Sequence, residues 1–134
     1  MSVVLDTNAL VWSVENAATL GKQAAVTIDA AVTGGEAYVS AISFWELALK
    51  ISQGRFRLGM AIKDWRTDVL RMGVHEVPVD GAIGIAANDL VNLHRDPADR
   101  LIVATALGLG AALVTSDAKL LAWKGPLACI NARV

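Results

Sequence analysis

The stretch VVLDTNALVW, residues 3–12, runs an apolar segment directly into an aspartate and two further polar residues. Its first three residues are typical of a short buried strand, and the apolar residues after Asn8 have helical character. A strand followed at once by a helix is the repeating unit of α/β proteins. Asp6 then stands at the carboxyl end of the strand, either as the N-cap of the helix or as part of a site.

The same alternation continues along the chain. Short apolar runs predict strands over residues 3–5, 37–41, 74–79, 111–115 and 126–130. Apolar residues at helical spacing predict helices over residues 9–14, 21–33, 43–53, 61–71, 80–93, 98–109 and 116–123. This order favours an α/β sandwich with a mainly parallel sheet, in which ligands bind beyond the carboxyl ends of the strands.

Length and composition restrict the class of protein. The chain has 134 residues, of which 54% are hydrophobic and 19% charged, and its net charge is −1. We therefore expect one domain over residues 1–134 that does not hold nucleic acid by bulk positive charge. No apolar run approaches the ~18 residues of a membrane span, no secretory signal is recognisable, and Cys129 has no cysteine partner. A cytoplasmic protein without a membrane partner is expected.

Four acids stand at predicted junctions between strands and helices: Asp6, Glu46, Asp99 and Asp117. Each has a purely structural interpretation as a helix cap or first-turn acid. Ser43 and Glu46 have the spacing of a capping box, Asp96 would cap the helix that contains Asp99, and Ser116 would cap the helix that contains Asp117.

Taken together, the four acids also predict a site. Asp6 and Asp117 follow apolar strands, and a parallel sheet would bring the helices of Glu46 and Asp99 to the same edge. Two carboxylates about 4 Å apart repel by ~1 kcal/mol in water and by ~4 kcal/mol at an effective dielectric constant near 20. Such a cluster either has raised pKa values or binds a cation, and Mg²⁺ or Mn²⁺ suits oxygen ligands best. Spacing alone leaves capping and metal binding both open.

At these residues the sequence resembles the PIN-domain family, and more narrowly the VapC-type toxin ribonucleases of bacterial toxin–antitoxin pairs. Four segments carry the resemblance in order along the chain: LDTNALVW, SAISFWELALKISQGRF, HRDPADRLIVATAL and LVTSDAKLL. Position 98 is Ala and position 105 is Thr where many relatives have an aromatic residue and Gln. Neither departure removes an acid.

The resemblance implies a PIN-like three-layer sandwich and a metal-dependent endoribonuclease that uses a metal-activated water. Asp6 and Asp99 would be direct ligands of Mg²⁺ or Mn²⁺, and Glu46 and Asp117 would complete the catalytic quartet. Supporting polar positions would be Thr7, Asn8, Thr115 and Ser116. Arg100 would contact phosphate or pair with an acid.

The resemblance also implies partners: an RNA substrate, a cognate antitoxin protein and a second copy of the chain in a homodimer or larger assembly. Arg55 and Arg57 lie in a predicted loop suited to RNA or antitoxin, and residues 44–51 and 61–70 are candidates for an antitoxin groove. Trp45 is a candidate for base stacking because it precedes Glu46. His94 could act as a general base, although the sequence shows no partner for it.

Two other functions remain compatible with the residues. One is a non-catalytic module on a PIN scaffold that binds RNA or protein. The other is a receiver-like or phosphatase-like α/β domain, which also gathers acids, hydroxyls and a lysine at strand ends.

Overall fold

The computed structural model describes all 134 residues. It contains five strands and seven helices: β1 (Val3–Leu5), α1 (Thr7–Glu15), α2 (Lys22–Thr33), β2 (Ala37–Ser40), α3 (Ala41–Ser52), α4 (Ile62–Arg71), β3 (His75–Val77), α5 (Gly81–Asp89), α6 (Pro97–Leu109), β4 (Ala112–Thr115), α7 (Ala118–Ala122) and β5 (Cys129–Asn131). The predicted α/β class is confirmed, because strands and helices alternate over most of the chain.

The five strands form one sheet in the order β3-β2-β1-β4-β5, and every pair is parallel. β1 is central, with β2 on one side and β4 on the other. The chain builds outward from β1 through β2 to β3, and then crosses to β4 and β5. The direction of winding therefore reverses between β1 and β4, and this is the position where open α/β sheets bind ligands.

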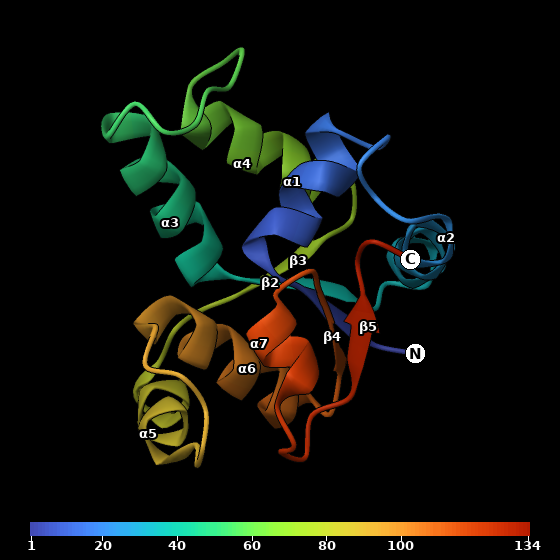
Figure 1. Ribbon diagram of the computed structural model, residues 1–134. Helices are drawn as coiled ribbons and strands as arrows, with labels where there is room; N and C mark the ends of the chain where they lie inside the picture. The colour runs from blue at the N-terminus through green and yellow to red at the C-terminus, as the bar shows by residue number, and fades with distance from the viewer.

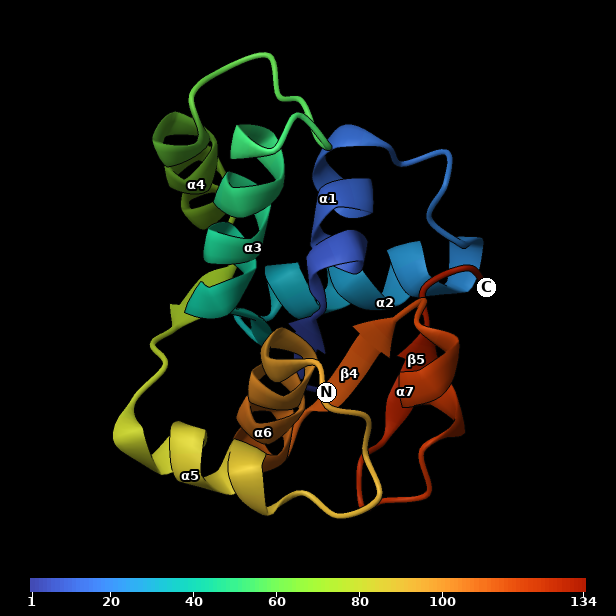
Figure 2. The same ribbon diagram turned by 60° about the vertical axis from the view of Figure 1, so that its left-hand side comes forward.

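Helices cover both faces of the sheet and complete the predicted three-layer sandwich (Figure 1). Alternate residues of β1 point to opposite faces, so that Val3 and Leu5 join one core and Val4 joins the other. The first core lies under α1 to α4, and its largest fully buried side chain is Trp65. The second core lies under α6 and α7 and includes Ile102 and Leu113. Figure 2 shows α2 running beneath α1 on its side of the sheet.

Several predicted boundaries are wrong, and two of these matter for the site. α3 begins at Ala41 and its N-cap is Ser40, so Ser43 lies within the helix and forms no capping box with Glu46. α7 is capped by Asp117 itself, whose side chain accepts from the amides of Lys119 and Leu120, and Ser116 does not cap it. In both cases the helix starts at a different polar residue, because several nearby side chains can each serve as an N-cap.

α5 ends at Asp89 although the apolar spacing predicts a helix to Leu93. Beyond Asp89 the backbone turns away from the helix, and Asn92 has a positive φ of 59°. β3 is confined to His75–Val77, and β5 lies slightly later than predicted because its register on β4 pairs Thr115 with Asn131. None of the helices combines the length and apolar character that crossing a membrane would require.

Candidate metal centre

The four predicted acids meet in one cavity at the carboxyl edge of the sheet. The cavity has a volume of about 170 Å³, and no hydrophobic side chain lines it. Its walls come from four parts of the chain: Asp6, Thr7, Asn8, Glu46, Lys50, Asp96, Asp99 and Asp117. Local sequence separation gave no hint of this proximity, which arises because the parallel strands and the helices α3 and α6 all reach this edge.

Asp6 is the most deeply buried of these acids, with 7% of its surface exposed. Its Oδ1 accepts from the amide of Ala9 at 2.8 Å, which caps α1, and its Oδ2 accepts from the hydroxyl of Thr115 at 2.5 Å. The same Thr115 oxygen accepts from the amide of Asp117 at 3.0 Å. Thr115 therefore ties the ends of β1 and β4 together and holds both aspartates beside each other.

Burial raises the pKa of Asp6 to about 6, against the opposing effect of these hydrogen bonds, and the charges of Asp99 and Asp117 raise it further. The cap that the sequence predicts for Asp6 is thus present, but it uses only one carboxylate oxygen and leaves a buried negative charge only partly compensated.

Glu46 projects from α3 toward the start of α1. Its Oε1 accepts from the Thr7 hydroxyl at 2.5 Å, and the Thr7 oxygen lies 2.9 Å from the hydroxyl oxygen of Ser43. A hydroxyl has one proton, so we assign the Thr7 proton to Glu46 and a proton donated by Ser43 to Thr7. Burial raises the pKa of Glu46, Thr7 lowers it, and the Asp99 charge raises it again.

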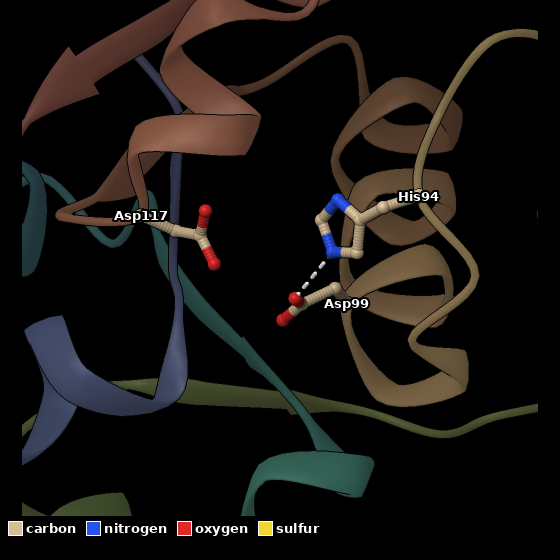
Figure 3. A group of neighbouring side chains, drawn as sticks. All are labelled: His94, Asp99 and Asp117. Carbon is tan, nitrogen blue, oxygen red and sulfur yellow. Dashed lines mark hydrogen bonds and ion pairs between the residues drawn. The ribbon is translucent and has the colours of Figure 1, made fainter.

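Asp99 lies in the first turn of α6, behind the N-cap Asp96 as the sequence predicts. Its Oδ2 lies 2.8 Å from Nε2 of His94, while Nδ1 of His94 is buried with no hydrogen-bond partner. We assign a proton to Nε2, since this nitrogen faces a carboxylate. Figure 3 shows the imidazole beside Asp99, with the Asp117 carboxylate directed toward both. Ligand atoms of these three residues lie within 4.8 Å of one another, and the cluster can hold a metal ion.

The electrostatics of the cavity favour a cation. Burial is the main cause of a raised pKa at Asp99 as well, and Asp96 and Asp117 add to it, while the hydrogen bond from His94 opposes it. Lys50 lowers the pKa of Glu46, but it is the only basic residue that lines the cavity. The donor set consists mainly of carboxylate and hydroxyl oxygens, which is the set that hard divalent cations prefer. The residues therefore fit such an ion.

The predicted supporting residues lie at or beside this cavity. Thr7 and Thr115 are buried and hydrogen-bonded to acids, as described above. Asn8 is exposed at the rim of the cavity, and Ser116 lines an adjoining hollow of about 590 Å³ that also contains Arg95, Lys119 and Arg133. This hollow places positive charge next to the acids. Arg55 and Arg57 are exposed in the loop after α3 and do not line the acidic cavity.

Arg100 has neither of the two predicted roles. All five of its N–H groups donate to backbone carbonyls, namely those of Ala87, Asn88, Leu90, Leu93 and His94. No donor remains for a phosphate, and no acid pairs with it. The last carbonyls of a helix have no amide partner within that helix. At the carboxyl end of α5 the guanidinium of Arg100 binds these carbonyls, and this is why α5 ends early.

For three residues near the acids, the structure shows contacts that the sequence did not predict. Asp96 was assigned only as a cap, yet its carboxylate also lines the cavity. Lys50 lies one helical turn after Glu46, a spacing that could have placed it on the same face. His94 had no recognisable partner, although Asp99 is only five residues away and the intervening residues form the cap of α6.

Comparison with known proteins agrees with this geometry. The family model described as PIN domain matches residues 3–124. The chain belongs to the PIN domain family. This PIN domain is also 33% identical over 126 residues to Ribonuclease VapC22 of Mycobacterium tuberculosis, a match that covers 93% of this chain and 94% of the relative.

Solved structures with this fold include VapBC2 of Rickettsia felis bound to a promoter DNA fragment, with a TM-score of 0.67, 18% identity and coverage of 98% of both chains. A toxin–antitoxin complex of Klebsiella pneumoniae has a TM-score of 0.66, 18% identity and 98% coverage of both chains. FitAcB of Neisseria gonorrhoeae has a TM-score of 0.66, 19% identity and 97% coverage of both chains. The expected PIN-like fold is confirmed.

The receiver-like alternative is wrong. Receiver domains have the strand order 2-1-3-4-5, with the switch point between the first and third strands. In this PIN domain the order is β3-β2-β1-β4-β5, and the switch point lies between β1 and β4. The acids after β1 and β4 therefore belong to the crevice of a differently wound sheet.

Proposed function

We propose that this PIN domain is a metal-dependent endoribonuclease that acts as the toxin of a toxin–antitoxin pair, with residues 1–134 as one functional domain. The observation that carries the proposal is the cavity in which Asp6, Glu46, Asp99 and Asp117 converge without any hydrophobic side chain. The 33% identical relative is named a ribonuclease, and this supports RNA as the substrate class.

The ligand roles follow from how each carboxylate is held. Asp6 and Asp99 are assigned as direct ligands of Mg²⁺ or Mn²⁺, because each is fixed by hydrogen bonds and faces the other acids. Glu46 and Asp117 complete the set through carboxylate or water contacts. Thr7 and Thr115 orient the acids that they contact, and Asn8 and Ser116 offer polar groups at the entrance to the site.

The bound cation would supply an activated water nucleophile and would neutralise charge on the phosphate and the leaving oxygen. The chain's own residues do the positioning. Thr115 and Thr7 keep the carboxylates of Asp6 and Glu46 in fixed orientations, and His94 does the same for Asp99. Because these contacts exist before substrate binds, little reorganisation accompanies the reaction.

Basic residues around the acids would guide the RNA phosphates. Lys50 is inside the cavity, and Arg55 and Arg57 stand in the exposed loop that follows α3. With a net charge of −1, the domain depends on such local groups rather than on an overall positive field. This arrangement suits an enzyme that cuts selected RNA.

The proposed partners are a cognate antitoxin protein and a second copy of the chain, and the proposed location is the cytoplasm. Two of the structures that share the fold are described as toxin–antitoxin complexes or as VapBC bound to promoter DNA. The exposed surfaces of α3 and α4 remain the candidates for antitoxin binding.

The test is cleavage of total bacterial RNA by the purified protein with Mg²⁺ or Mn²⁺. Asp6→Asn and Asp99→Asn should each lower the rate by more than roughly 100-fold, since changes to outer-sphere partners alone cost about 10–100-fold. Asp80→Asn is the matched control, because Asp80 caps α5 and does not line the cavity. It should cleave like the wild type.

Full cleavage by both variants, or by wild type in excess EDTA, would contradict the metal site. A folded wild type that binds RNA but never cuts it would favour the non-catalytic alternative. The toxin role is tested separately by inducing the chain alone in a bacterium, where growth should stop, and then together with its neighbouring gene, where growth should resume.

A further inference from the structure

Besides the hollow that contains Ser116, another hollow opens beside the acidic cavity. It has a volume of about 400 Å³ and lies between α3 and the start of α6. We call it the α3–α6 groove. Trp45 and Leu49 line it from α3, and Pro97 and Ala98 line it from α6. Glu46, Lys50 and Asp96 line both the groove and the acidic cavity, so the two hollows share a wall.

Trp45 is exposed to an unusual degree for a tryptophan. Its relative exposure is 56%, whereas Trp65 in the core is 1% exposed. Leu49 lies one helical turn further on and is 39% exposed, so the two side chains share one face of α3. Exposed large apolar side chains gathered at one hollow mark a binding surface more often than scattered ones do.

Charge is distributed unevenly along the groove. Arg55 brings positive charge from the loop after α3 and does not line the acidic cavity, whereas Glu46, Asp96 and the positively charged Lys50 form the wall that the groove shares with that cavity. The side chain of Arg55 makes only one hydrogen bond within the chain, from Nη1 to Oε1 of Gln53 at 3.4 Å, and its other side-chain donors are available. An exposed aromatic ring next to free cations is the combination that binds single-stranded nucleic acid, since the ring stacks on a base and the cations meet phosphates.

We propose that the α3–α6 groove is a nucleotide subsite, in which Trp45 stacks on a base adjacent to the scissile phosphate and Arg55 binds the phosphate beyond it. This inference rests on the proposed nuclease function and extends it to the choice of cleavage site. When a scissile phosphate lies at the acids, the next nucleotide must lie close by. Of the two hollows that adjoin the acidic cavity, only the α3–α6 groove contains an exposed aromatic ring. A single-stranded RNA accounts for the exposed aromatic ring, the cations and the continuity with the acids together.

Binding is measured with a short fluorescent single-stranded RNA of randomised sequence and a stoichiometric excess of Mg²⁺. The protein carries Asp99→Asn throughout, so that the RNA stays intact. Adding Trp45→Ala should raise the Kd by roughly 5- to 150-fold, which is the range for losing one base–aromatic stack. Trp45→Phe should keep most of the affinity. Met72→Ala removes a similarly exposed apolar side chain (50%) after α4 and should have no effect.

The salt dependence separates the two contacts. Arg55→Ala should lower the slope of log Kd against log salt by about 0.7, the value expected for one phosphate contact of a single strand. Trp45→Ala should weaken binding at every salt concentration without changing the slope. Arg71→Ala removes an exposed arginine at the end of α4, outside the groove, and is the matched control.

With Asp99 restored, Trp45→Ala should raise KM far more than it lowers kcat, and sequenced cleavage ends should show a weaker preference for the base beside the cut. If Trp45→Ala binds RNA as tightly as the parent protein, the proposal is overturned. If that variant also no longer forms a dimer, the face is instead an interface between copies of the chain. Wild type that binds RNA through Trp45 but never cleaves refutes the nuclease function and leaves the subsite standing. Cleavage with no effect of Trp45 refutes only the subsite.

Discussion

At the scale of single residues, His94 shows how a neighbouring side chain holds one of the proposed metal ligands. Its Nε2 lies 2.8 Å from Asp99, and both side chains are about one-fifth exposed. A carboxylate that must bind a metal gains from a hydrogen bond that fixes its orientation, because less order is then lost on binding. The buried Nδ1 has no partner, so the imidazole serves Asp99 through one nitrogen only.

We therefore predict that His94→Ala lowers Mn²⁺ affinity by roughly 10- to 100-fold, the usual cost of losing such a partner. His94→Gln should retain most of the affinity, because its amide nitrogen can take the place of Nε2. Calorimetric titration of Mn²⁺ into the RNA-free protein measures this directly. Equal affinities for wild type, His94→Ala and His94→Gln would exclude a positioning role for His94.

How far the site could be predicted also depends on single residues. Asp6, Asp99 and Asp117 could be found because each ends a strand or begins a helix, and the parallel sheet gathers such positions at one edge. Glu46 was found although its predicted place at the start of a helix is wrong, since it lies in the second turn of α3. Lys50 and the second role of Asp96 could not, because they depend on which way α3 and α6 face. The role of Arg100 was out of reach for the same reason, since its partners are backbone carbonyls and no sequence pattern identifies them.

At the scale of elements, the segment from α5 to α6 is built around Arg100. No acid pairs with its guanidinium, whose N–H groups donate to five backbone carbonyls between Ala87 and His94. Apolar spacing predicts a longer α5, but these carbonyls bind the arginine rather than helical amides. His94 lies in the same loop between α5 and α6. By fixing the backbone of this loop, Arg100 therefore helps to position the imidazole beside Asp99.

Replacing Arg100 by Lys should destabilise the protein by roughly 2–4 kcal/mol, because an ammonium has three donors at one point and leaves several carbonyls unpaired. Urea unfolding measures the loss, and amide exchange should become faster over residues 88–96. Mn²⁺ affinity should also fall, since His94 loses its support. Arg95→Lys changes an exposed arginine of the same loop and should stay within about 0.5 kcal/mol of wild type. Equal losses in both variants would refute this account.

At the scale of the whole molecule, the acidic cavity opposes folding when no metal is bound. The pKa of Asp6 is about 6 against an ordinary value of 3.8, and this difference corresponds to roughly 3 kcal/mol. The pKa values of Glu46 and Asp99 are raised as well. Raised values mean that the folded state binds these protons more strongly than the unfolded chain does. The stability that they contribute is complete below about pH 4 and is lost as the pH rises through about 6.

Two glutamates outside the cavity have lowered pKa values, and their contribution to the stability of the fold has the opposite pH dependence. Arg66 lowers the pKa of Glu76, and the terminal amine lowers that of Glu36. Stability from these two pairs is lost only when the pH falls below the ordinary glutamate range, near 4.5. The interval between about pH 5 and 7.5 therefore reports mainly on the cavity acids.

In EDTA, the wild type should become more stable as the pH is lowered from about 7.5 to about 5. Asp6→Asn should be more stable than wild type near pH 7.5 and should show a weaker pH dependence, because an amide keeps the α1 cap without the buried charge.

Added Mn²⁺ at about 100 times its Kd should stabilise the wild type by roughly 2.7 kcal/mol and the variant by much less. Asp80→Asn changes a cap outside the cavity and should follow the wild type in both experiments. Thermal unfolding at the two pH values, with and without Mn²⁺, provides the comparison. If the metal-free wild type instead loses stability toward pH 5, or Mn²⁺ stabilises both proteins equally, Asp6 does not carry the buried charge that the cation compensates. The acids would then be caps that happen to meet, which is the interpretation that spacing alone left open.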